Sequence, residues 1–171
     1  MHPAILAWAE ADRRLDLEAM REQLAEDVQL DSPLTDAFTF TGPDQVMAVM
    51  ESAFELLEQI EIHKLTGAAR TYALYGTSRL RGRNLEEIQW LELSPTGRIQ
   101  KITLFIRPVP AAVSLLALIG PELARRGVLT RRATVASRAA APIASVLRAV
   151  ETSVMPRLRR PGVTGGPHRT D

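Results

Sequence analysis

This 171-residue chain contains no cysteine, so it can form no disulfide, thiolate zinc site or iron–sulfur cluster. The absence is compatible with a reducing compartment, and we expect a cytoplasmic protein. Of its three histidines, His2 and His168 lie near the termini, so we expect no metal site. The chain also lacks a phosphate loop, a dinucleotide fingerprint and a nucleophile elbow, and we expect no cofactor.

Long apolar runs are missing as well. The longest, residues 109–119, stops at Gly120-Pro121 and is far shorter than the ~20 residues that span a bilayer. The N-terminus lacks the positive-then-apolar order of a signal peptide. Aromatic residues make up only 5% of the chain and are not interleaved with its basic residues, so we expect no nucleic-acid partner. The apolar fraction of 46% is nevertheless ample for a core.

Charge is unevenly distributed although the net charge is +1. Residues 1–108 carry 11 basic and 17 acidic side chains, whereas residues 109–171 carry 10 basic and 3 acidic ones. The change falls at Pro108-Val109-Pro110 and predicts a domain boundary there. We predict a domain at 1–108, a helical extension at 109–155 and a disordered basic tail at 156–171, where Pro, Gly and Arg predominate.

The pattern of apolar residues predicts an α+β domain organised around a long hairpin. The expected helices cover residues 5–14, 17–25 and 43–58, and the expected strands cover residues 28–30, 59–66, 70–81, 85–93 and 99–107. The last two strands are joined by the turn Ser94-Pro95-Thr96-Gly97. Helices gathered on one face of an antiparallel sheet are typical of an α+β fold.

The extension is expected to contain two helices. The first covers residues 111–119, is broken by Gly120-Pro121 and continues to Arg126; its apolar residues predict packing on the protein itself, across a pocket mouth or a dimer partner. The second runs from a cap at Thr130 through Val150 and carries an apolar stripe among arginines. It could pack on the first helix or lie on an anionic membrane surface.

Three segments of the chain carry a family resemblance. They are Leu24-Ala25-Glu26-Asp27-Val28 leading to Ser32-Pro33, Thr41-Gly42-Pro43-Asp44-Gln45-Val46, and Pro95-Thr96-Gly97-Arg98-Ile99-Gln100-Lys101-Ile102 leading to Phe105 and Pro108. Together they resemble the SnoaL-like branch of the nuclear transport factor 2-like superfamily over roughly residues 5–108. The resemblance implies a cone in which a curved antiparallel sheet wraps three N-terminal helices around a pocket, with the helical extension outside the usual pattern. It also implies a homodimer.

The resemblance leaves the activity open, because the superfamily includes steroid isomerases, polyketide cyclases, epoxide hydrolases, dehydratases and many binding domains. Our first hypothesis is that the pocket binds a small apolar organic molecule. The second is an isomerase, cyclase or hydratase that uses a pocket carboxylate, and the third is an interaction or membrane-surface protein acting through the C-terminal helices. Near the end of the last strand, where epoxide-hydrolysing relatives carry an acid, this chain has Thr103-Leu104-Phe105, which argues against that reaction.

Glu87 is the candidate catalytic residue. Together with Gln89 it shares a strand face with Leu85 and Leu91, and an acid between apolar neighbours is unusual for a solvated face. We therefore predict that Glu87 and Gln89 point into the concavity of the sheet. A carboxyl group there would have a raised pKa and could act as a general base. The alternative is an exposed or salt-bridged strand residue.

Besides Gln89, five residues are candidates for ligand binding. Each has a structural alternative: core packing for the two aromatic residues, a sheet bend for the two small ones and a turn cap for the aspartate. They are Trp8, Asp31, Tyr72, Gly76 and Ser78.

Overall fold

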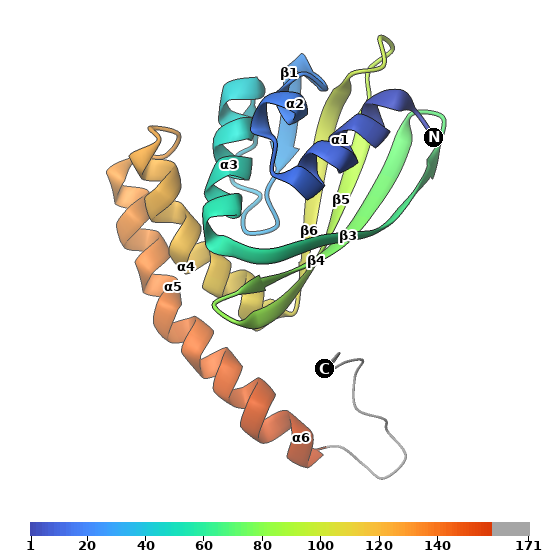
Figure 1. The fold of residues 1–171 in the computed structure, drawn as a ribbon. Coiled ribbons are helices and arrows are strands. Elements are labelled where there is room, and N and C mark those ends of the chain that lie inside the picture. Colours follow the sequence, from blue (N-terminus) through green and yellow to red (C-terminus); the bar gives the residue numbers. More distant parts are fainter. Residues whose placement is uncertain (159–171) are drawn as a thin grey trace.

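The structure is a computed structural model that describes residues 1–158, apart from the side chains of Arg131 and Ala133. Its helices are α1 (Pro3–Arg14), α2 (Leu17–Arg21), α3 (Pro43–Leu56), α4 (Val109–Arg125), α5 (Arg131–Ala149), the π-helical η1 (Val150–Val154) and α6 (Met155–Leu158). Its strands are β1 (Leu24–Asp31), β2 (Phe40–Thr41), β3 (Leu57–Ala68), β4 (Thr71–Leu80), β5 (Arg83–Leu93) and β6 (Ile99–Arg107) (Figure 1).

The predicted order of elements is confirmed, with three differences. The short strand β2 is an addition, and α2 ends at Arg21 because the chain enters β1 already at Leu24. The helical extension runs to Leu158, three residues into the predicted tail. The rest of that predicted tail, residues 159–171, lies outside the described residues.

The six strands form one sheet in the order β2-β1-β6-β5-β4-β3. All neighbours are antiparallel except β1 and β6, which run parallel. The sheet curves around α1 and α3 (Figure 1), which confirms the predicted α+β cone. Two irregularities in the pairing of β3 with β4, one of them just after the pair Ile62–Gly76, help the long strands to bend.

The concave face of the sheet is set by strand parity. In β4, Tyr72, Leu74, Ser78 and Leu80 are buried and alternate with more exposed residues, as the sequence predicts for one face. In β5, every second residue from Leu85 to Leu93 points to that same face. The apolar side chains of both strands thus meet the helices and form the core.

Helix α1 crosses the concave face and begins at a histidine cap. Nδ1 of His2 accepts a hydrogen bond from the backbone N–H of Ala4, which satisfies one of the free donors of the first turn. The buried stripe of the helix contains Ile5, Trp8 and Asp12, at helical spacing. An aspartate therefore lies on the side of the helix that faces the sheet.

Helix α4 packs against the core, as predicted from its apolar residues. Leu115, Ile119 and Leu123 are all buried in the same hydrophobic cluster as the sheet and α3. The expected break at Gly120-Pro121 is wrong, because α4 continues through Pro121 to Arg125. Burial of Ile119 and Leu123 on either side of the proline outweighs the single helical hydrogen bond that the proline removes.

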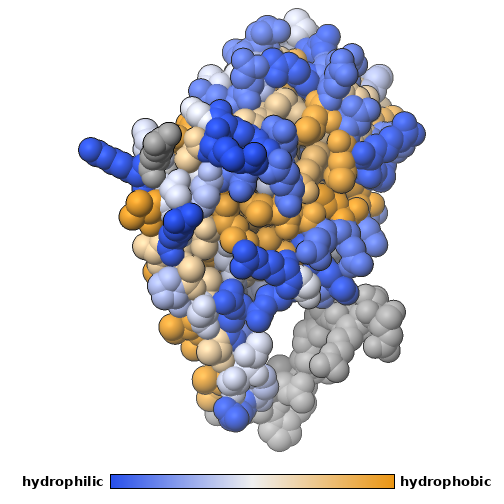
Figure 2. Space-filling view, turned by 60° about the vertical axis from the view of Figure 1, so that its left-hand side comes forward, coloured by the Kyte–Doolittle hydropathy of each residue, from blue (hydrophilic) through white to orange (hydrophobic). Residues whose placement is uncertain are grey.

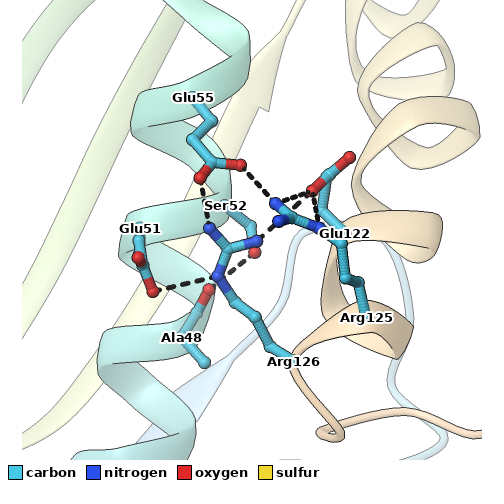
Figure 3. A network of polar contacts seen from close by, with 7 residues as sticks. All are labelled: Ala48, Glu51, Ser52, Glu55, Glu122, Arg125 and Arg126. Atoms are coloured by element: carbon cyan, nitrogen blue, oxygen red, sulfur yellow. Dashed lines mark hydrogen bonds and ion pairs between the residues drawn. The ribbon is translucent and has the colours of Figure 1, made fainter.

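The C-terminal end of α4 is tied to α3 by a cluster of charged side chains (Figure 3). Arg126 donates from Nε to Glu51 over 2.9 Å and from Nη2 to Glu55 over 2.6 Å. Arg125 also contacts Glu55, over 2.9 Å, and both arginines contact Glu122 of α4. The hydrogen bond from Arg126 is the main cause that lowers the pKa of Glu51. The acidic face of α3 therefore meets the basic end of the extension.

Helix α5 packs on α4 through small residues and leaves its larger apolar side chains outside. Ser137, Ala140 and Ala144 are buried, whereas Ile143 and Val146 are 56% and 63% exposed. Figure 1 shows the C-terminal half of this helix projecting beyond the sheet, and Figure 2 shows hydrophobic side chains along its length. The predicted stripe thus exists but is not covered by the described residues.

Candidate functional site

A cavity of about 50 Å³, partly open to the surface, lies between the concave face of the sheet and helices α1, α3 and α4. Its wall is almost entirely apolar and includes Met50 and Phe54 of α3, Leu104 of β6 and Leu115 and Ile119 of α4. Asp12, Glu87, Gln89 and Ser78 bring polar atoms into this wall. The arrangement is typical of small-molecule sites, which combine apolar walls with a few placed polar groups.

The amide of Gln89 holds two carboxyl groups together at the cavity wall. Its Nε2 donates to Oδ2 of Asp12 over 2.8 Å and to Oε1 of Glu87 over 3.0 Å. The indole Nε1 of Trp8 donates to Oε1 of Gln89 over 2.8 Å. Because an indole can only donate, Trp8 fixes which end of the amide faces the carboxyl groups. Residues from α1 and β5, 77 positions apart in the chain, thereby form one connected unit.

Both carboxyl groups hold protons more tightly than in water. Burial, with a smaller contribution from the charge of Glu87, raises the pKa of Asp12 from 3.8 to about 7, against the opposing effects of Gln89 and Arg13. Burial also raises the pKa of Glu87, and its hydrogen bond from Gln89 opposes that rise. No arginine, lysine or histidine among the described residues lines the cavity. Ionisation of both groups is therefore disfavoured until the pH exceeds about 7, the pKa of Asp12.

The hydroxyl group of Ser78 is a further polar atom at the cavity. Ser78 is only 5% exposed, and its Oγ has no hydrogen-bond partner among the described residues. On the same face of the sheet, Gly76 stands directly opposite Glu87 in the β4–β5 pairing, and Ser78 lies two residues along. A Cβ at Gly76 would come within 3.0 Å of the carbonyl oxygen of Glu61, so any larger residue would push β3 away from β4 at this point. Gly76 therefore lies at a bend of the sheet, as predicted, and also forms part of the cavity wall.

The predicted site residues divide into those at the cavity and those elsewhere. Glu87 and Gln89 point into the concavity, as strand parity predicts, and Gly76 and Ser78 also line it. The remaining candidates do not line the cavity: Trp8 is buried behind Gln89, the carboxylate of Asp31 pairs with Lys101 over 3.0 Å, and the hydroxyl of Tyr72 donates to the carbonyl of Ala69.

Asp12 is the site residue that the sequence analysis missed. Its signal is present in the sequence, because Asp12 lies four residues after Trp8 and seven after Ile5 and so falls on the apolar stripe of α1. A carboxylate on such a stripe is rarely buried without a partner. Its contact with Gln89 depends on the crossing of α1 over β5, which no local pattern reveals.

Within residues 1–158, no three His, Asp or Glu side chains gather closely enough to hold a metal ion. None of the helices in that part of the chain has both the length and the hydropathy needed to cross a membrane.

Comparison with known proteins defines the fold. No protein-family model matches the chain, and no curated protein matches it. Among solved structures, an uncharacterised bacterial protein with a cystatin-like fold from Silicibacter pomeroyi has a TM-score of 0.69 at 23% identity, covering 82% of this chain and 95% of its own. A steroid delta-isomerase from Pseudomonas aeruginosa has a TM-score of 0.66 at 22% identity, covering 74% and 93%.

A structure from Shewanella denitrificans, assigned as a SnoaL-like polyketide cyclase, has a TM-score of 0.50 at 13% identity, covering 61% of this chain and 88% of its own. The chain therefore has the cone fold of NTF2-like and SnoaL-like proteins, as predicted. The Silicibacter match covers more of the chain than residues 1–108 contain, so it includes part of the helical extension.

Proposed function

We propose that this protein binds a small apolar organic molecule in the cone cavity, with a polar group of that molecule facing Asp12 and Glu87. The proposal rests on one observation, a pair of buried carboxyl groups in an otherwise apolar cavity. Burying an acidic group without a cation destabilises a fold. A protein that keeps two of them beside a cavity has an arrangement common at functional sites.

The size of the cavity limits the ligand. A volume of about 50 Å³ is well below the about 150 Å³ that accommodates a benzene ring in an engineered cavity. A ligand larger than a few heavy atoms therefore has to displace part of the wall. Leu115 and Ile119 are the wall residues contributed by the extension, so an outward shift of α4 is the simplest way to enlarge the site.

Tryptophan fluorescence tests this proposal. The chain has two tryptophans, and Trp90 is exposed, so a Trp90→Phe variant reports only on Trp8 behind the site. We expect apolar compounds of graded size to change Trp8 emission saturably. In this background Ala53→Leu, which adds three carbon atoms at the cavity wall, should weaken binding, whereas Ala7→Leu at an exposed position of α1 should not. Saturable binding that Ala53→Leu leaves unchanged would place the ligand outside the cavity.

An enzymatic function is the second candidate. One carboxyl group of the pair can donate a proton while the other accepts one, which suits isomerase, cyclase or hydratase chemistry on a molecule held in the cavity. Glu87 and Asp12 would be the acid–base groups and Gln89 the residue that positions them. Deuterium uptake next to the carbonyl of a small cyclic ketone in D₂O, followed by NMR, tests this role. We expect uptake by the native protein and loss of it in Glu87→Gln.

A surface role for the C-terminal helices is favoured by a separate observation. The uncovered side of α5 carries Val135, Ile143 and Val146, and the exposed arginines Arg132 and Arg138 lie on the same helix. Apolar side chains flanked by arginines are suited to an anionic membrane surface. We propose that this side of α5 contacts such a surface.

A homodimer is favoured by the outer face of the sheet. Ile88, Trp90 and Phe105 are exposed there, and Ile88 stands directly opposite Phe105 in the β5–β6 pairing. Charges of both signs lie at the two ends of this patch, in the cross-strand pairs Glu86–Arg107 and Glu92–Lys101. Because opposite charges at both ends can meet across a two-fold axis, the patch suits a second copy of the chain.

A further inference from the structure

We infer that the ligand of the cone cavity is an apolar molecule that carries a primary ammonium group, which Asp12, Glu87 and Ser78 receive together. This inference rests on the proposed binding function and adds the chemical class of the ligand. Three features of the cavity lead to it: its charge, its free acceptor atoms and the fixed orientation of Gln89.

The first argument is charge balance. Asp12 on α1 and Glu87 on β5 are the ionisable side chains that line the cavity; β1, β3, β4, β6, α3 and α4 contribute none from the described residues. Arg13, next to Asp12 in α1, is the charged neighbour that favours the ionised form of Asp12. Each carboxyl group that ionises leaves one negative charge in the apolar cavity. A ligand with a single positive charge neutralises it, whereas an alcohol or a ketone leaves it uncompensated.

The second argument is the geometry of the acceptors. Gln89 uses one oxygen of each carboxyl group, and these two oxygens lie less than about 6 Å apart because both are within 3.0 Å of the same nitrogen. The second oxygen of each group has no hydrogen-bond partner among the described residues. Ser78 adds an unpartnered hydroxyl on the neighbouring strand. A primary ammonium group has three N–H donors, one for each of these acceptors.

The third argument concerns Gln89 itself. Its two amide hydrogens are directed at the carboxyl groups, and Trp8 prevents the amide from presenting its oxygen to the cavity. Gln89 therefore holds both carboxyl groups as acceptors. Once ionised, the two groups present only acceptors to the ligand, and a ligand that is itself an acceptor, such as a carboxylate, is repelled.

The test compares ligands that differ only in their polar group. Isobutylamine and isobutanol form one matched pair, and cyclohexylamine and cyclohexanol form a second, larger pair. Binding is measured by calorimetry on the full chain at pH 5.5 and pH 8. We expect each amine to bind at least ~10-fold more tightly than its alcohol at pH 8, because buried charge-assisted hydrogen bonds exceed neutral ones.

The pH dependence gives a second readout. The amines keep their charge throughout this range, as lysine does, whereas the carboxyl pair takes up a proton on acidification. Amine affinity should therefore fall by up to about tenfold for each pH unit below about 7, the pKa of Asp12, and amine binding near that pH should release protons. The alcohols should show neither effect. Calorimetry in two buffers with different ionisation enthalpies measures the protons released.

Variants separate this inference from the proposed function. Glu87→Gln and Ser78→Ala should each weaken amine binding at least ~5-fold and leave alcohol binding within about twofold, because only the ammonium group needs all three acceptors. Glu61→Gln, on the exposed part of β3, is the matched control. If alcohols bind as tightly as amines, or if Glu87→Gln leaves amine binding unchanged, the ammonium class is wrong while the proposed function stands. If neither amines, alcohols nor other apolar compounds change Trp8 emission, the proposed function itself fails.

Discussion

Replacing Asp12 by asparagine should stabilise the protein at alkaline pH. The pKa of Asp12 rises from 3.8 to about 7 on folding, so the folded state binds this proton more tightly than the unfolded state. The contribution of Asp12 to the free energy of unfolding is therefore largest below pH 3.8. It falls as the pH rises from 3.8 to about 7, and above pH 7 the loss is complete.

The size of the effect follows from the same values. Each pKa unit corresponds to 1.36 kcal/mol, so the ionised form of Asp12 destabilises the fold by up to about 4 kcal/mol at pH 8. Asparagine has nearly the same shape, and its Oδ1 can still accept the hydrogen bond from Gln89. Its own burial offsets part of the gain, so we expect Asp12→Asn to be more stable than the native protein by about 1–4 kcal/mol at pH 8, and we expect this difference to be smaller by about 2–3 kcal/mol at pH 5.

Urea denaturation at pH 5, 6, 7 and 8, followed by tryptophan fluorescence, measures this difference directly. Asp36→Asn, in an exposed loop, serves as the control and should behave like the native protein at each pH. The reasoning is refuted if Asp12→Asn unfolds at the same or lower urea concentration than the native protein at pH 8. The reasoning is also contradicted if, between pH 5 and pH 8, the free energy of unfolding of Asp12→Asn falls as steeply with pH as that of the native protein.

Three further changes test other parts of the structure. Ile119→Ala should lower the free energy of unfolding by about 2–4 kcal/mol in urea titrations and raise the affinity for cyclohexanol, because it enlarges the cavity from the α4 side. Trp90→Lys should weaken self-association at least ~10-fold in analytical ultracentrifugation without lowering the melting temperature; a dimer that persists would place the interface elsewhere. The double change of Arg132 and Arg138 to Glu should abolish flotation with vesicles containing anionic phosphatidylserine, and salt should weaken flotation of the native protein; no flotation of the native protein would refute the membrane contact.

The sequence alone predicted the class of fold and, apart from the short strand β2, the order of its elements through β6. Alternation in β4 and β5 was sufficient to place Glu87 and Gln89 on the concave face, because a strand directs successive side chains to opposite sides whatever surrounds it. The apolar content of residues 111–126 predicted that α4 would pack on the protein. These are local properties, set by spacing and composition.

Which distant segments of the chain contact each other was decided by the tertiary structure. The parallel pairing of β1 with β6 and the contact of Asp12 with Gln89 join segments far apart in the chain, and neither spacing nor composition specifies such contacts. The continuation of α4 through Pro121 depends on burial of its neighbours against the core. The pair of carboxyl groups exists only because α1 crosses β5 at that point, and the raised pKa of Asp12 follows from the burial that this crossing imposes.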